Sequence, residues 1–147
     1  ALYKARHLDV SIKKIITLGT KFHWDESIAA KECKMLQPET IEQKVPAFAQ
    51  QLQQRHGNWK ELLNKTSAML QAMGKSNPLK PGDYASIQAH ALIMGGDKDK
   101  MVTMEETLAV FQELPQAQLA ILPGTPHAIE QVDVSLLSFH VLRFLHD

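Results

Sequence analysis

The sequence predicts an α/β fold: a partial parallel sheet of about three strands with flanking helices and an inserted helical region. Three short apolar runs closed by glycine or proline are typical of buried strands, and they are Ile15–Leu18, Ala91–Met94 and Leu119–Leu122. Helical patterns separate these runs, and this alternation favours parallel strands joined by right-handed crossovers. The long helical stretch between the first two strands predicts the inserted region.

Three helices are expected in the inserted region, at Glu26–Leu36, about Pro46–Arg55 and Asn58–Met73. Asn58 and Glu61 have the spacing of a capping box at the start of the third helix, and Gly74 is placed to end it. Two more helices are expected after the second and third strands, at Thr103–Leu114 and Val134–Leu145. Thr103 and Glu106 predict another capping box.

Composition and charge exclude several classes of function. Lys and Arg total 16, as do Asp and Glu, and this balance argues against a nucleic-acid surface, which needs an excess of basic side chains. No apolar run approaches the roughly 20 residues that span a bilayer. No charged leader opens the chain, so we expect a cytoplasmic protein without a membrane partner. The single cysteine, Cys33, rules out an internal disulfide framework. We expect no metal and no other cofactor.

Two titratable residues follow the second and third predicted strands. Asp99 lies in the turn after Ala91–Met94, and His127 lies shortly after Leu119–Leu122. Neighbouring parallel strands lie about 5 Å apart and end at one edge of the sheet, so loops that leave them can bring these side chains together. A carboxylate on one imidazole nitrogen leaves the other nitrogen free to accept a proton from a nucleophile. The pair therefore predicts the acid and base of a hydrolytic triad.

Other acids remain open as alternatives. Asp97 competes with Asp99, although a carboxylate in a glycine-rich turn is more often a turn former. Asp25 and Glu26 follow the first strand, where they would otherwise begin a helix, since carboxylates favour the positive end of a helix. His23 and Trp24 lie in the same connection and are candidates either for lining a substrate pocket or for anchoring the inserted region.

The segments that contain these residues, 87–102 and 119–127, resemble the carboxyl-terminal part of an α/β-hydrolase. The resemblance rests on two motifs, which are Gly96-Asp97-Lys98-Asp99 and Pro123-Gly124-Thr125-Pro126-His127. Residues 1–6 resemble the end of the helix that follows the nucleophile in this family, and residues 15–20 resemble the next strand. The resemblance implies that Asp99 is the triad acid and His127 the general base. It also implies that residues 22–80 form a substrate-covering cap, with residues 1–21 and 81–147 as the core.

The nucleophile elbow of this family, Gly-x-Ser-x-Gly, does not occur in the sequence. None of the seven serines has a glycine two residues away on both sides. We therefore expect the chain to be a fragment, the C-terminal half of an α/β-hydrolase fold. The nucleophile, Ser or Asp, would lie in an N-terminal half that the chain lacks, and the chain alone would be inactive.

Two hypotheses about function stay open. In the first, the chain is part of an esterase-like serine hydrolase that acts on a small-molecule substrate. In the second, it is a noncatalytic remnant or an interaction module of the same fold. The Ile15–Leu18 strand would have an unpaired edge without a preceding strand. We therefore expect that strand to pair with a second copy of the chain or with the missing half.

Overall fold

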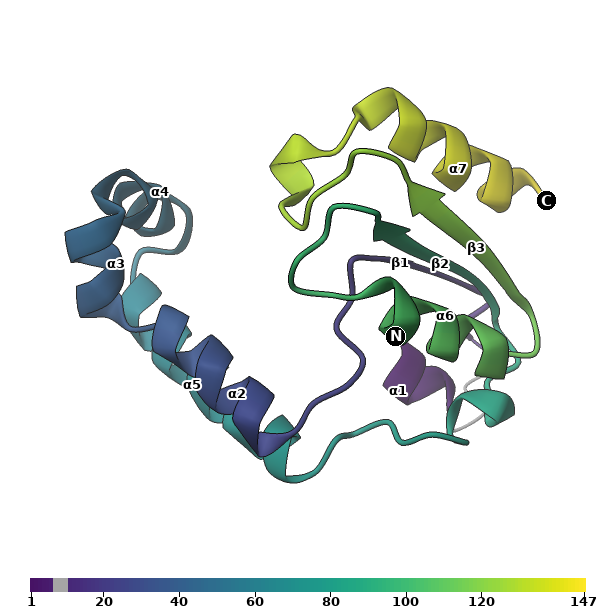
Figure 1. Ribbon diagram of the computed structural model, residues 1–147, viewed down its shortest axis with the longest axis horizontal. Helices are drawn as coiled ribbons and strands as arrows, with labels where there is room; N and C mark the ends of the chain where they lie inside the picture. The colour runs from purple at the N-terminus through teal and green to yellow at the C-terminus, as the bar shows by residue number, and fades with distance from the viewer. Residues whose placement is uncertain (7–10) are drawn as a thin grey trace. The chain divides into compact units, whose positions relative to one another are not determined.

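The computed structural model describes residues 1–6 and 11–147, which form two compact units. The first unit combines Ala1–Phe22 with Leu79–Asp147, and the second is His23–Pro78. Figure 1 shows the first unit as a sheet with helices and the second as helices alone. The sequence predicted a division at residues 22 and 80, and the assignment of the second unit as a cap stays a prediction.

The first unit is built on a parallel sheet in the order β1 (Lys14–Leu18), β2 (His90–Gly96) and β3 (Ala117–Leu122). The predicted α/β fold with a three-stranded parallel sheet is confirmed. β2 is longer than its apolar run because Gly95 and Gly96 continue the ladder opposite Ile121 and Leu122. β3 begins earlier than its run because Ala117 and Gln118 pair with Ala91 and Leu92. Backbone pairing needs no apolar side chain, so the ends of these strands carry no hydrophobic signal.

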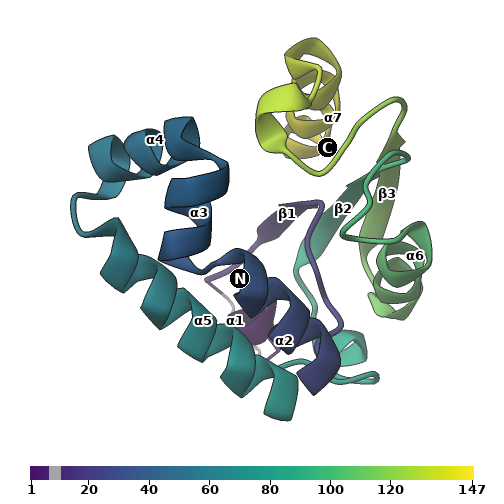
Figure 2. The same ribbon diagram turned by 60° about the vertical axis from the view of Figure 1, so that its left-hand side comes forward.

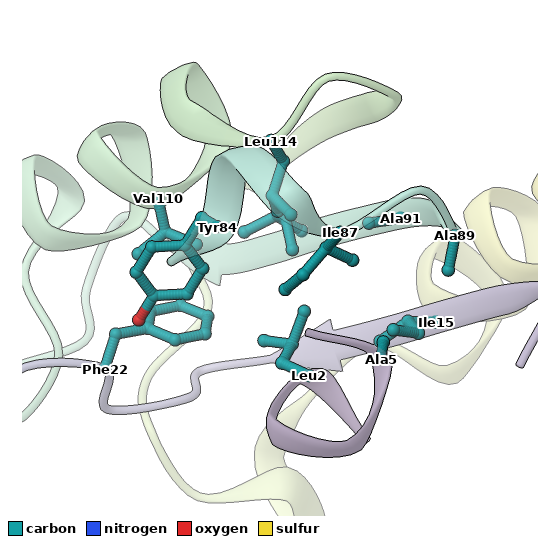
Figure 3. Packing of buried hydrophobic residues seen from close by; sticks show 11 residues of the cluster. Leu2, Ala5, Ile15, Phe22, Tyr84, Ile87, Ala89, Ala91, Val110 and Leu114 are labelled. Atoms are coloured by element: carbon teal, nitrogen blue, oxygen red, sulfur yellow. The ribbon is translucent and has the colours of Figure 1, made fainter. Parts of the chain in front are cut away.

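Helices cover both faces of the sheet, as Figures 1 and 2 show for α6 and α7. The helical elements of this unit are α1 (Leu2–Ala5), η1 (Tyr84–Ser86), α6 (Met104–Glu113), η2 (Ile129–Gln131) and α7 (Val134–His146). On one face α1 and α6 pack around Ile15, Ala91 and Ile93, in the cluster drawn in Figure 3. On the other face Phe144 of α7 packs against Leu92. β2, buried between the two layers, therefore reads as a continuous apolar run.

The capping box predicted at α6 is only half formed. Thr103 Oγ1 accepts a hydrogen bond from the backbone N–H of Glu106, as an N-cap does. The Glu106 carboxylate, however, binds the chain that leaves β1: Lys21 Nζ lies 3.1 Å from Oε2, and the Phe22 N–H donates to Oε1 at 2.5 Å. An ion pair together with a hydrogen bond from a backbone N–H stabilises this carboxylate more than the single N–H at the start of a helix would.

The second unit consists of α2 (Glu26–Met35), α3 (Pro38–Lys44), α4 (Pro46–His56) and α5 (Trp59–Lys75). α3 lies outside the predicted helices, because only two of its residues, Pro38 and Ile41, are buried, and two residues are too few to form a repeating apolar face. The capping box predicted at α5 is wrong. Asn58 makes no side-chain bond to the helix backbone, and its Nδ2 instead donates to Glu61 Oε2 at 2.6 Å.

The predicted role of Gly74 as a helix stop is also wrong. α5 continues through Lys75, and Gly74 lies inside it, where α5 meets α2. A Cβ at Gly74 would lie 2.7 Å from Ala29 Cβ and 2.8 Å from the carbonyl oxygen of Asp25. The glycine is therefore required by close helix packing, which a single sequence cannot separate from helix termination.

Candidate active site

Asp99 and His127 lie at the carboxyl ends of β2 and β3, and their side chains are hydrogen-bonded. His127 Nδ1 lies 2.9 Å from Asp99 Oδ2. The Asp99 side chain is 2% exposed, whereas the imidazole is 39% exposed. The acid is thus buried under the loop and the base is open to an incoming group. The meeting of these two side chains, on which the sequence interpretation depends, is observed, and their catalytic roles stay a prediction.

The loop after β2 holds the Asp99 carboxylate in place from its other side. Oδ1 accepts hydrogen bonds from the backbone N–H groups of Met101 at 2.8 Å and Val102 at 2.9 Å. Burial raises the pKa of Asp99, but the bonds from Val102, His127 and Met101 outweigh burial and hold that pKa below its usual value. The carboxylate therefore stays ionised at neutral pH and can accept a hydrogen bond from the Nδ1–H group of His127.

Gly19, directly after β1, forms a wall of the same site. Its φ of +54° lies in the left-handed region, and its N–H donates to the carbonyl oxygen of Met94 at 2.9 Å. A Cβ at this position would lie 3.2 Å from Asp99 Oδ2 and 3.6 Å from His127 Nδ1. Sequence reasoning took Gly19 only as the end of a strand and missed this contact.

The alternative acids are engaged elsewhere. The carboxylate of Asp97 accepts a hydrogen bond from the backbone N–H of Thr125, with an O···N distance of 3.2 Å. Asp25 belongs to the second unit and caps α2, where its Oδ1 accepts from the N–H of Ile28 at 2.7 Å. Glu26 lies in the first turn of that helix. Asp99 is the carboxylate that the structure brings to His127.

His23 and Trp24 begin the second unit. The His23 ring is exposed, and its Nε2 lies 3.6 Å from Asp25 Oδ2. Trp24 is half-buried. A substrate-binding role for these two residues stays a prediction.

None of the seven serines lies in a loop that follows a strand of the sheet. They are Ser11, Ser27, Ser67, Ser76, Ser86, Ser135 and Ser138. Within residues 1–6 and 11–147, no group of three or more His, Cys, Asp or Glu side chains is arranged to hold a metal ion. In the same part of the chain, no helix has the length and apolar character needed to cross a membrane.

Solved structures that superpose on this chain identify its fold. NosK from Streptomyces actuosus superposes with a TM-score of 0.70 at 18% identity, over 99% of this chain and 65% of its own. MGS-M2, an α/β hydrolase enzyme from a Medee basin deep-sea metagenome library, gives 0.66 at 18% identity, over 99% and 60%. A protein described as a lipase from Acinetobacter baumannii gives 0.73 at 18% identity, over 99% and 56%.

This chain has part of the α/β-hydrolase fold. It spans about 55–65% of the length of the solved structures that it matches. No family model matches the sequence, and no curated protein does. The sequence-based recognition of an α/β-hydrolase fold is therefore confirmed by the structure, and identities of 18% carry the fold alone.

Proposed function

We propose that this chain supplies the acid and the general base of an esterase-like serine hydrolase. The hydrogen bond between His127 Nδ1 and Asp99 Oδ2 is the observation that carries the proposal. It links a buried carboxylate to an open imidazole at the carboxyl edge of a parallel sheet, which is where such folds gather their ligands. The α/β-hydrolase fold of the chain and the enzymes among its structural neighbours support this proposal.

The proposed mechanism uses both nitrogens of His127. Asp99 accepts a hydrogen bond from the Nδ1–H group and so holds the tautomer that has a lone pair on Nε2. Nε2 takes the proton of a serine hydroxyl as the serine oxygen attacks the substrate carbonyl carbon. The imidazolium then gives that proton to the leaving group, and the ester bond breaks. A water, deprotonated by the same Nε2, releases the acyl group and restores the serine.

The nucleophile in this proposal comes from sequence outside these 147 residues. Each loop that follows a strand here lacks serine, so no serine of the chain occupies the place of a nucleophile elbow. The partial coverage of the matched hydrolase structures agrees with this. The substrate is a small ester-like molecule, and the chemistry needs no metal or organic cofactor.

The second unit serves as the cap in this proposal. It is inserted in the connection that leaves β1 and begins four residues after Gly19, where an added Cβ would contact both Asp99 and His127. A helical insertion at the carboxyl end of a strand can cover a substrate and exclude water from the reacting groups. His23 and Trp24, at the start of the insertion, are proposed to contact the substrate.

The experiment compares the full-length gene product that contains this sequence with the isolated 147-residue chain, using p-nitrophenyl acetate as substrate. We expect hydrolysis by the full-length protein and none by the chain alone. His127→Ala in the full-length protein should lower kcat by about 10⁴ or more, and Asp99→Asn by about 10⁴. His140→Ala, on α7, is the matched control and should leave kcat unchanged. Robust turnover by the isolated chain, or an active His127→Ala protein, would refute the proposal.

A further inference from the structure

The loops that carry Asp99 and His127 are joined to each other two residues before each of them. Asp97 Oδ1 accepts a hydrogen bond from the Thr125 N–H, with an O···N distance of 3.2 Å. In the opposite direction, the Lys98 N–H donates to the Thr125 carbonyl oxygen at 3.1 Å. The loop after β2 therefore forms hydrogen bonds with both the N–H and the carbonyl oxygen of Thr125, and His127 follows two residues later.

Gly96 makes this contact possible. A Cβ at Gly96 would overlap the carbonyl oxygen of Thr125 and would lie 2.8 Å from its carbonyl carbon. The obstacle is backbone on both sides, so no side-chain rotation could relieve it. Thr125 is itself 3% exposed, and its Oγ1 donates to the carbonyl oxygen of Pro123 at 3.1 Å. The two loops are thus packed backbone against backbone, without room for a methyl group.

This contact between the two loops matters because burial alone does little to hold the His127 imidazole in place. His127 is 39% exposed at its side chain, so surrounding atoms restrain it less than they restrain Asp99. A general base has to lie within hydrogen-bond reach of its partners, and a displacement of about 1 Å costs roughly 10²-fold in rate. A loop fixed at Thr125 leaves only two residues of freedom before His127.

We propose that Gly96, Asp97 and Thr125 form a joint that positions His127 against Asp99, with Asp97 acting as a hydrogen-bond acceptor. Asp97 is then a positioning residue. This inference deepens the proposed function and rests on it for the catalytic meaning of the Asp99–His127 pair. Asp97 is not assigned as the triad acid, because its Oδ1 accepts from the backbone N–H of Thr125, whereas Asp99 Oδ2 is hydrogen-bonded to the His127 ring.

Acceptor and acid roles predict different outcomes for two substitutions. Asp97→Asn keeps an oxygen that can accept from the Thr125 N–H, whereas Asp97→Ala removes the acceptor altogether. The asparagine variant should therefore behave like the wild type, and the alanine variant should free the loop. Asp133→Ala is the matched control, because it removes a similar bond, from the Leu136 N–H to Asp133 Oδ1 at 3.0 Å, at the start of α7.

The experiment is NMR on the 147-residue chain with ¹⁵N-labelled histidine, so no nucleophile is needed. The readouts are the tautomer of His127 and the exchange rate of its Nδ1 proton with water. We expect the Nδ1–H tautomer in the wild type, Asp97→Asn and Asp133→Ala. In Asp97→Ala we expect exchange about tenfold faster, as befits the loss of one hydrogen bond to a charged group. Gly96→Ala, which forces the loops apart, should show the same acceleration and serves if Asp97→Ala does not fold.

Unchanged exchange in a folded Asp97→Ala or Gly96→Ala protein would overturn the inference. Equal acceleration in Asp97→Asn would overturn the acceptor role, and acceleration in Asp133→Ala would show that any loss of stability mimics the effect. A full-length protein without esterase activity, together with the expected NMR contrast, would remove the proposed function and leave the joint in place.

Discussion

Lys14 on β1 binds the end of α7: its Nζ lies 2.9 Å from the carbonyl oxygen of Phe144 and 2.9 Å from that of Leu145. These carbonyls lie in the last turn of the helix, where they have no intrahelical partner and the helix dipole favours a cation. The same ammonium lies 5.4 Å from the centre of the Phe144 ring. One side chain thus fastens the last helix to the first strand.

Replacement of Lys14 by methionine should lower the free energy of unfolding by about 1 kcal/mol, because two carbonyl groups lose a charged donor while the apolar stem remains. Urea denaturation followed by circular dichroism measures this difference. Lys13→Met, at the neighbouring exposed position, is the control and should change stability by less than about 0.5 kcal/mol. Equal effects of the two substitutions would show that the helix contact contributes nothing.

Gly19→Ala should disrupt the Asp99–His127 pair. The added methyl group would lie 3.2 Å from Asp99 Oδ2, and the residue would also be strained at a φ of +54°. Gly57→Ala has nearly the same strain, at a φ of +59°, with nothing within 4 Å of the added carbon. We expect both variants to lose about 1 kcal/mol of stability, and only Gly19→Ala to accelerate exchange of the His127 Nδ1 proton. An unchanged exchange rate of the His127 Nδ1 proton in Gly19→Ala would show that residue 19 does not contact the Asp99–His127 pair.

The lowered pKa of Asp99 makes part of the stability depend on pH. Because the pKa of this carboxyl is lower in the folded chain than its ordinary value of 3.8, its contribution is complete above pH 3.8. The contribution is lost as the pH falls from 3.8 through the folded pKa. Asp99→Asn should therefore be less stable at pH 7 and should lose less stability between pH 4 and pH 2. Urea titrations at several pH values test this; parallel curves for the two proteins would contradict it.

Tyr84 gives the opposite dependence at alkaline pH. Burial, followed by the nearby charges of Glu113 and Glu106, raises its pKa from 10.0 to about 12. The contribution of the neutral phenol is complete below pH 10 and is lost as the pH rises through 12, because the unfolded chain releases the proton first. Tyr84→Phe should flatten that loss, which amounts to at most about 3 kcal/mol. Urea denaturation at several pH values between 9 and 12 measures this loss, and an equally steep loss in Tyr84→Phe would contradict the assignment to Tyr84.

The outer side of β1 is proposed to pair with a strand from outside this chain. Among the described residues β1 pairs with β2 alone, so its other side presents backbone donors and acceptors. If the isolated chain associates through this edge, sedimentation should show a concentration-dependent dimer. The backbone N–H groups of residues 14–18 should then exchange more slowly as concentration rises. A monomer with fast exchange along this edge at all concentrations would contradict self-pairing.

The sequence predicts the features that depend only on the local pattern of residues within one strand or loop. β2 is recognisable because both of its faces are buried, and Asp99 and His127 are recognisable because each follows a strand. Contacts between distant segments are different. Gly19 lies close to Asp99, 80 positions later in the sequence, and Asp97 is hydrogen-bonded to Thr125, 28 positions later. Both contacts depend on the register of the strands, which no local sequence pattern encodes. Glu106 shows the same limit, since its partners Lys21 and Phe22 follow β1 and lie more than 80 positions earlier in the sequence.

The contact between Gly74 and Asp25 has a consequence for how the chain can be varied. Asp25 follows the entry into the helical insertion, and Gly74 precedes its exit, so the insertion starts and finishes at one point. A segment whose ends already touch can be excised, lengthened or exchanged with little entropic cost to the chain around it. The length and sequence of the inserted helices can therefore change while the strands and their loops keep their geometry.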